Sequence, residues 1–291
     1  MDKKLKSVLI ALFVTFLWST SWVLIKVGLV DIPALPFAGL RYLFASIILF
    51  IYMIFTRKIY LISSLSKQQW KTLLIYGFVL ITLTQGAQFL ALSMLPAVTL
   101  SLFLNMSPIF VLFLGYFFLK ETINGVQMLG IVLFFFGIII YFYKVDLGSN
   151  LPGLALAVFG VAVNAIAAVY GRSINAKRDI DPMVITVVIT GFGSIFLLLG
   201  GVAIQGMPVL NVQGWLIVGW LAAINTALAF TLWNTALREL KAVEANTINN
   251  TMLIQIALLA AIFLNESLTL RQWLAIAVVA VGVWLVQLRK N

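Results

Sequence analysis

The chain has 291 residues, of which 63% are hydrophobic and 10% are charged, and its mean hydropathy is +1.12. A water-soluble domain carries charges on about a quarter of its residues, so this composition excludes a soluble protein and indicates an integral membrane protein. The sequence contains neither cysteine nor histidine, which excludes disulfide frameworks, thiolate metal sites and imidazole proton relays. The net charge of +10 fits cytoplasmic loops that face anionic lipid better than it fits binding to nucleic acid.

Ten apolar stretches follow one another along the chain, and each is long enough to cross a bilayer core of ~30 Å as a helix. They cover residues 7–29, 34–55, 71–92, 96–118, 125–143, 151–171, 183–204, 214–236, 242–264 and 271–288. The connections are short, and most are marked by Pro, Gly, Asn, Asp or Ser. The first stretch exceeds the core of a signal peptide and lacks an Ala-x-Ala cleavage pattern, so we interpret it as a retained span.

The second half of the sequence repeats the first at a constant offset of 145 residues. The matches of scarce residue types are the informative ones: Asn105 with Asn250, Glu121 with Glu266, Gln127 with Gln272 and Gly137 with Gly282. We assign residues 1–146 to the first repeat and residues 147–291 to the second. Because each repeat holds five spans, the second enters the membrane inverted. The sequence therefore predicts an all-α membrane protein of ten transmembrane helices, built as two inverted five-helix repeats around a central cavity.

The distribution of Lys and Arg predicts the orientation in the membrane. If the N-terminus is cytoplasmic, 15 of the 19 Lys and Arg residues fall on the cytoplasmic side and two, Lys144 and Arg271, fall outside. The remaining two, Lys26 and Arg41, lie within spans. The positive-inside rule therefore places both termini in the cytoplasm of a cell whose plasma or inner membrane holds the chain.

Several short motifs resemble those of the drug/metabolite transporter superfamily, in its ten-span EamA-type branch. They are Trp18-Ser19-Thr20-Ser21-Trp22 with Lys26 in span 1, Leu40-Arg41-Tyr42 in span 2, and the segments Leu119–Ile123 and Leu264–Leu268. Each of these two segments leads into a helix that carries one of the matched Gln and Gly residues. The resemblance covers nearly the whole chain and implies a carrier, typically an exporter of amino acids or other small metabolites, without defining the substrate.

The two charged residues within spans are candidates for the substrate cavity, because a charge in hydrocarbon is costly. Lys26 lies about 12 Å from the middle of its span, where a lysine can also snorkel to the interface. Arg41 lies about 6 Å from the middle of span 2, so it needs a wet cavity or a partner. Asp31 is the nearest acidic residue, and a structural tie between Arg41 and Asp31 is the alternative to a role in transport.

Polar and aromatic residues near the middle of other spans complete the predicted cavity. Asn105 and Asn250 match across the repeat at mirrored depths, and Asn246 lies one turn before Asn250. Helix–helix contact is the alternative role for these amides. Pro108 predicts a kink in span 4, either static or a hinge. The further candidates for the cavity lining are Trp18, Ser19, Trp22, Gln85, Gln88, Asn164, Trp233 and Asn234, although any single tryptophan can instead face lipid.

Taken together, these patterns predict a secondary transporter that moves a small metabolite outward by alternating access. A zwitterionic or amphipathic solute, and an amino acid in particular, suits a cavity with two basic residues and no mid-span Asp or Glu. An organic-anion or sugar-phosphate exchanger and a channel-like facilitator are the alternatives. The sequence has no ATP-binding loop and no set of catalytic or metal-binding residues, so we expect no enzyme, no metal and no cofactor. The expected partners are the substrate and the lipid bilayer, with no nucleic acid, in a monomer or weak dimer.

Overall fold

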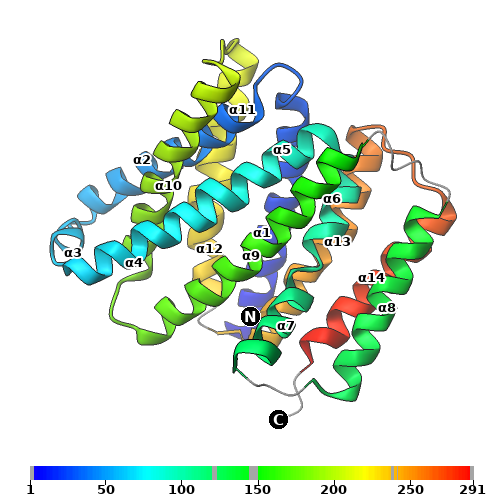
Figure 1. The fold of residues 1–291 in the computed structure, drawn as a ribbon. Helices are drawn as coiled ribbons and strands as arrows, with labels where there is room; N and C mark the ends of the chain where they lie inside the picture. The colour runs from blue at the N-terminus through cyan, green and yellow to red at the C-terminus, as the bar shows by residue number, and fades with distance from the viewer. Residues whose placement is uncertain (1–2, 120–122, 144–149, 237–238, 241, 289–291) are drawn as a thin grey trace.

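The computed structural model describes residues 3–119, 123–143, 150–236, 239–240 and 242–288, and throughout these ranges the regular elements are helices (Figure 1). The first repeat supplies five helical segments. Three are single helices: α1 (Lys3–Gly28), α2 (Ala34–Phe55) and α8 (Gly125–Phe142). Two are divided: α4–η1–α5 (Lys67–Gly77, Phe78–Gln85, Gly86–Met94) and α6–α7 (Ala97–Leu104, Ser107–Leu119). The second repeat supplies α9 (Leu151–Lys177), α10 (Pro182–Gln205), α11–η3–α12 (Val212–Ala222, Ala223–Leu228, Ala229–Ala236), α13 (Ala242–Phe263) and α14 (Leu270–Gln287). A short helix, α3 (Tyr60–Ser63), lies in the linker after α2.

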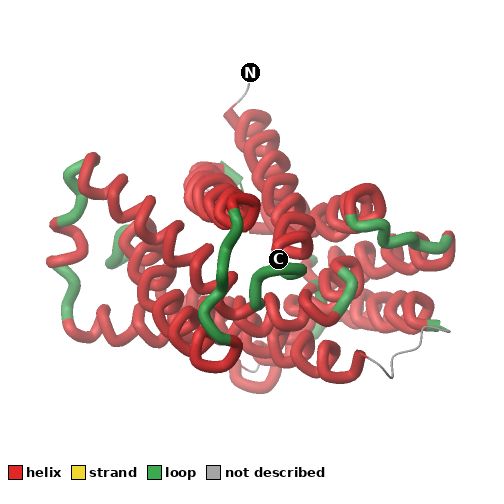
Figure 2. Tube along the Cα trace, turned by 90° about the horizontal axis from the view of Figure 1, so that it is seen from above, coloured by secondary structure: helices red, strands yellow, loops and turns green. Residues whose placement is uncertain are grey.

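The ten predicted spans are confirmed as helical segments, with ends that differ by a few residues. Eight of the helices in the described part of the chain are long and apolar enough to cross a membrane. Two shorter apolar stretches, Ala97–Phe113 and Thr247–Phe263, lie where the sequence predicts the fourth and ninth spans. The chain is therefore a multi-pass membrane protein. Viewed from above, its helices are joined by short loops (Figure 2).

Equivalent helices of the two repeats begin in the same way. Asn124 caps α8 by accepting from the backbone amide of Gln127, and the Gln127 side chain accepts from the Asn124 amide in return. Thr269 and Gln272 form the same reciprocal pair at the start of α14. Such a capping box satisfies amides that would otherwise lack a partner in the first helical turn. The two boxes are 145 residues apart, so the repeat seen in the sequence is also a repeat of local structure.

The second and fifth spans of the first repeat each pack against the equivalent span of the second repeat. α2 packs along α10, and α8 packs along α14; each pair runs in opposite directions, as inversion requires (Figure 1). Glycines bring the backbones of α8 and α14 close together, since a Cβ atom at Gly282 would lie 2.7 Å from the amide nitrogen of Phe134 and 2.8 Å from the carbonyl oxygen of Gly130. Small residues serve this purpose at helix contacts in membranes. Both chain ends lie at the same end of the bundle (Figure 1).

Three spans depart from regular α-helix in their middle. The third and eighth spans each contain a π-helical segment, η1 and η3, and these begin 145 residues apart at Phe78 and Ala223. In each, a threonine hydroxyl donates to the carbonyl five residues earlier: Thr84 to Val79 and Thr226 to Leu221. The fourth span is interrupted after Leu104, and its second part, α7, begins at Ser107. π-helical segments are rare in proteins, and those that occur are often found at functional sites. The middle of the bundle is therefore the place to look for a site.

Candidate functional site

Arg41 lies inside the bundle on α2 and is 6% exposed. Its Nε donates to the hydroxyl of Thr226 in η3 at 3.1 Å, which joins the first repeat to the second. This is its one hydrogen bond within the described ranges, and no ion pair there joins it to Asp31. The proposed tie to Asp31 is therefore replaced by a contact with a neutral hydroxyl. A guanidinium has five N–H donors, and the bond to Thr226 uses one of them.

The next residue on α2 contacts the other π-helical segment. The hydroxyl of Tyr42 donates to the side-chain oxygen of Gln85, the last residue of η1, at 2.7 Å. The guanidinium carbon of Arg41 also lies 5.2 Å from the centre of the Tyr42 ring. Two adjacent residues of α2 thus bond to η1 in one repeat and to η3 in the other. The predicted candidates Arg41 and Gln85 are thus linked through Tyr42.

Asn225, beside Thr226 in η3, is a candidate that the sequence reasoning missed. Its side chain is fully buried, and its Nδ2 donates to the carbonyl of Leu17 and to the hydroxyl of Thr20 on α1, at 3.2 Å for the latter. Its Oδ1 has no hydrogen-bond partner among the residues that the structure describes. The position at the centre of the span 214–236 was a signal that could have identified it. A buried acceptor of this kind is uncommon in proteins, and here it lies next to the residue whose hydroxyl binds Arg41.

A second polar contact joins α1 to α13 across the repeats. Ser19 donates to the side-chain oxygen of Gln255 at 3.0 Å. The Gln255 amide nitrogen in turn donates to the hydroxyls of Thr15 and Thr251, at 3.3 and 3.0 Å. Ser19 is a predicted candidate, whereas Gln255 was missed. Its signal in the sequence was its spacing from Thr251, four residues earlier and on the same helix face.

Three predicted asparagines lie elsewhere and bond to nearby helices. Asn105 donates to the carbonyl of Ser101 in its own span at 2.8 Å. Asn164 on α9 donates to the hydroxyl of Ser107 at 3.0 Å, and Asn250 on α13 donates to Gln287 on α14 at 3.1 Å. None of these bonds reaches Arg41 or the π-helical segments. In this conformation each amide makes a local contact between or within helices.

The remaining predicted residues are spread along the bundle. Trp18 contacts Trp233, with ring centres 5.1 Å apart, whereas Trp22 is buried in the apolar core. Gln88 is half-buried on α5, and Pro108 lies in the first turn of α7, just after the interruption of the fourth span. The side chains of Asn234 and Asn246 lie outside the described residues. Trp18 and Trp233, which the sequence offers as separate candidates, thus form a direct contact between the repeats.

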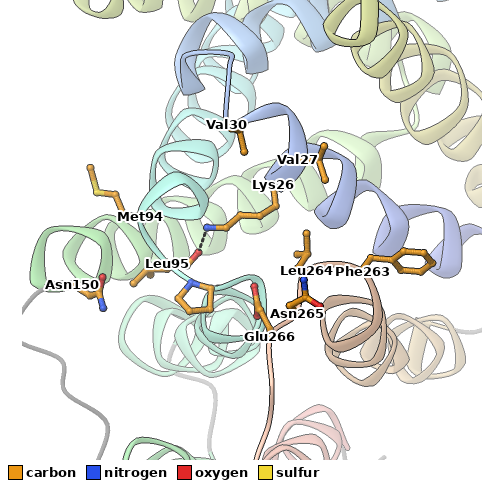
Figure 3. A pocket seen from close by; sticks show the side chains of 11 residues that line it. Lys26, Val27, Val30, Met94, Leu95, Asn150, Phe263, Leu264, Asn265 and Glu266 are labelled. Atoms are coloured by element: carbon orange, nitrogen blue, oxygen red, sulfur yellow. Dashed lines mark hydrogen bonds between the residues drawn. The ribbon is translucent and has the colours of Figure 1, made fainter.

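A pocket of about 670 Å³ opens at the end of the bundle opposite the chain termini (Figure 3). Lys26 lies in its wall, and its ammonium donates to the carbonyl oxygens of Leu92 and Leu95, both at 2.7 Å. These are carbonyls at the C-terminus of α5, which a basic side chain satisfies favourably. The ammonium group of Lys26 is thus bonded to the end of a neighbouring helix, and the snorkelling alternative stays a prediction.

Glu266 lies in the wall of the same pocket and bonds to the helix that follows. Its carboxylate accepts from the backbone amides of Ala97 at 2.7 Å and Val98 at 3.2 Å, which are the first residues of α6. A carboxylate at a helix N-terminus satisfies free amides and the positive end of the helix dipole. Its sequence counterpart, Glu121, lies outside the described residues.

Inverted helical repeats with polar side chains buried between them define a membrane transport protein. Residues 5–143 and 151–288 each match the EamA-like transporter family, and the chain belongs to this family. Its members are named as transporters and efflux pumps and not as enzymes.

Relatives match over nearly the full length of the chain. An uncharacterized transporter of Bacillus subtilis strain 168, YvbV, is 24% identical over 99% of this chain and 93% of its own. A probable amino-acid metabolite efflux pump of Escherichia coli strain K12 is 26% identical over 96% of this chain and 94% of its own. A solved crystal structure at 15% identity covers 98% of both chains with a TM-score of 0.71, and it shows that the fold is shared.

Proposed function

We propose that this transporter carries a zwitterionic metabolite, an amino acid with an apolar side chain, outward across the cell membrane by alternating access between the two repeats. The observation on which this rests is Arg41, a cation buried between the repeats whose one hydrogen bond within the described ranges goes to a neutral hydroxyl. A buried cation is costly without a counter-charge, so a carboxylate that enters the site is bound strongly.

The charge of the site favours a substrate with one negative group. Arg41 is the one charged residue among the buried side chains of the described chain. A phosphate ester carries up to two negative charges and is commonly held by several basic groups, which argues against a sugar-phosphate exchanger. The free Oδ1 of Asn225 is suited to accept from the ammonium group of the same substrate. Trp18 and Trp233 supply an apolar surface for its side chain.

Two further parts of the proposal come from the sequence and from one relative. The excess of Lys and Arg on one side supports a cytoplasmic position for both termini. The Escherichia coli relative is named a probable amino-acid metabolite efflux pump, which supports an amino acid and outward movement for this chain at 26% identity. We also propose that the first repeat ends at residue 146 and the second begins at residue 147, and that the protein is a monomer or a weak dimer.

The test is transport by purified protein in liposomes, measured with a panel of labelled amino acids and with the corresponding carboxylic and phosphate-bearing compounds. We expect Arg41→Ala to abolish transport while its melting temperature stays near that of the unmodified protein. Thr226→Val is the matched control, because it removes the hydroxyl that binds Arg41 and keeps the charge. It should retain transport within a few-fold. Equal loss of folding in both variants would make Arg41 a structural tie and would overturn its role in the site.

The same liposomes distinguish a carrier from a channel. A carrier gives a flux that saturates with substrate and that accelerates when unlabelled substrate is present on the opposite side. Ohmic conductance without such exchange would exclude alternating access.

A further inference from the structure

The turn between the third and fourth spans, Leu95-Pro96, joins two helix ends whose backbone hydrogen-bonding groups have no partner within the turn. α5 ends at Met94, and its last carbonyls lack helical partners. α6 begins at Ala97 after Pro96, whose ring provides no side chain that can accept from the first amides. By contrast, Ser66, Asn124, Asp181, Asn211 and Thr269 each cap the helix that they precede.

Both helix ends of this turn are completed by residues from distant parts of the chain. Lys26 of α1 bonds to the end of α5, and Glu266 bonds to the start of α6 (Figure 3). Glu266 lies 169 residues away in the linker between α13 and α14 and belongs to the second repeat. The bond of Lys26 stays within the first repeat, whereas the bonds of Glu266 join the two repeats at the end of the bundle opposite the termini.

The surroundings of Glu266 allow its bonds to break and re-form. The carboxylate is half-buried in the wall of the open pocket, so water can replace the two amides when the linker moves away. Below the turn, α6 packs on α13 through buried residues, and Ser101, one turn further in, is 1% exposed. Separation of the first turn of α6 from the α13–α14 linker would therefore open this contact toward the pocket.

We propose that Glu266 is the latch of the outer gate: its two hydrogen bonds to the start of α6 hold the repeats together at the outer face, and their release opens that face. Lys26 keeps the end of α5 and the turn rigid, so that α6 moves as a unit. This inference rests on alternating access, as proposed above, but not on the identity of the substrate.

The test measures opening directly, in the absence of any substrate. The chain has no native cysteine, so Ser101→Cys provides a single thiol behind the latch. Two vesicle preparations are used, right-side-out and inside-out. An impermeant maleimide is added to the preparation in which the face opposite the termini is outward, and the other preparation reports labelling from the opposite face. We expect slow labelling in Ser101→Cys alone and about tenfold faster labelling when Glu266→Gln is added. This is the size of effect that the loss of a charge-assisted hydrogen bond produces on a minor open state.

A second variant removes the other half of the same bonds. Ala97→Pro deletes one amide that Glu266 accepts from, and proline is well tolerated at the first position of a helix. It should also speed labelling of Ser101→Cys. Because both changes break one interaction, combining Ala97→Pro with Glu266→Gln should give much less than the product of the two separate effects.

Glu244→Gln is the matched control, because Glu244 pairs with Lys4 at 2.6 Å at the opposite end of the bundle. It should not speed labelling from the outer face. Unchanged labelling in both folded latch variants would show that Glu266 only caps α6, and the proposal would fail. Equal acceleration by Glu244→Gln, or equal acceleration from both faces, would indicate general loosening and would also overturn it.

Discussion

The buried side-chain oxygen of Asn225 accepts no hydrogen bond from the residues that the structure describes, and an unsatisfied group of this kind costs about 1–3 kcal/mol. If the substrate ammonium donates to this oxygen, Asn225→Ala removes one charge-assisted hydrogen bond and should raise the KM for an amino acid about tenfold. The KM for the same compound without its amino group should not change. Both are measured by competition for uptake into liposomes.

Thr20→Ala is the control for this prediction, since it removes a group that the Asn225 side chain binds and leaves its oxygen in place. The preference for the amino compound should survive in Thr20→Ala. If Asn225→Ala instead weakens both compounds equally, Asn225 supports the fold of η3 and does not bind the amine.

At the scale of residues, the sequence identified which charges are buried but not what they contact. The depth of Arg41 in span 2 followed from counting residues, whereas its partner Thr226 is 185 positions away and has no charge that marks it. The sequence predicts a position near the interface for Lys26, whereas its observed bonds go to backbone carbonyls, which every residue has. Side-chain patterns cannot predict such partners, because they depend on which helix ends meet in space.

At the scale of helices, the close contact of α8 and α14 predicts a strong cost for any side chain at Gly282. Gly282→Ala would place a Cβ atom under 3 Å from backbone atoms of α8, which cannot move as a side chain can. We expect a fall in melting temperature of roughly 3 to 10 °C. Gly219→Ala on α11 is the control, because a Cβ atom there meets nothing within 4 Å, and it should leave the melting temperature unchanged or slightly raised.

The helices themselves were largely predictable, because a bilayer requires runs of about 20 apolar residues and the sequence shows them directly. The π-helical segments η1 and η3 were not predictable in this way. A π turn differs from an α turn in hydrogen bonding and not in apolar composition, and the threonines that bond five residues back look ordinary in the sequence. Pro108, in contrast, correctly marked the fourth span as irregular, because proline removes a backbone donor.

At the scale of the whole molecule, the inverted repeat predicts a definite topology. The C-terminus should be cytoplasmic, and the loop between α10 and α11, at Gly206–Asn211, should lie outside. A reporter that is active only in the cytoplasm should therefore be active when fused after the C-terminus and inactive when fused after Gly206. Equal signals from the two fusions would exclude the inverted arrangement and the mechanism that depends on it.

The architecture as a whole was the most predictable level, because duplication leaves a signal at every matched position. The offset of 145 residues that pairs Asn105 with Asn250 also pairs the capping boxes of α8 and α14 and the starts of η1 and η3. The central polar residues were less predictable, because they do not match across the repeat: Arg41, Tyr42 and Asn225 correspond at the same offset to Thr186, Val187 and Leu80, none of which is the same residue type.

The contact between Arg41 and Thr226 also has a consequence for how the chain is made. A ribosome adds about 5–20 residues per second, so Thr226 is synthesised roughly 10 to 40 s after Arg41. During that interval α2 has neither this hydroxyl nor α10, along which it packs in the finished protein. Insertion of a mid-span arginine costs about 2.5–3.5 kcal/mol. The newly synthesised α2 must therefore stay near the translocon, or shift toward the interface, until the second repeat has been inserted. The residue proposed to bind the substrate thus makes the first half of the protein dependent on the second during biogenesis.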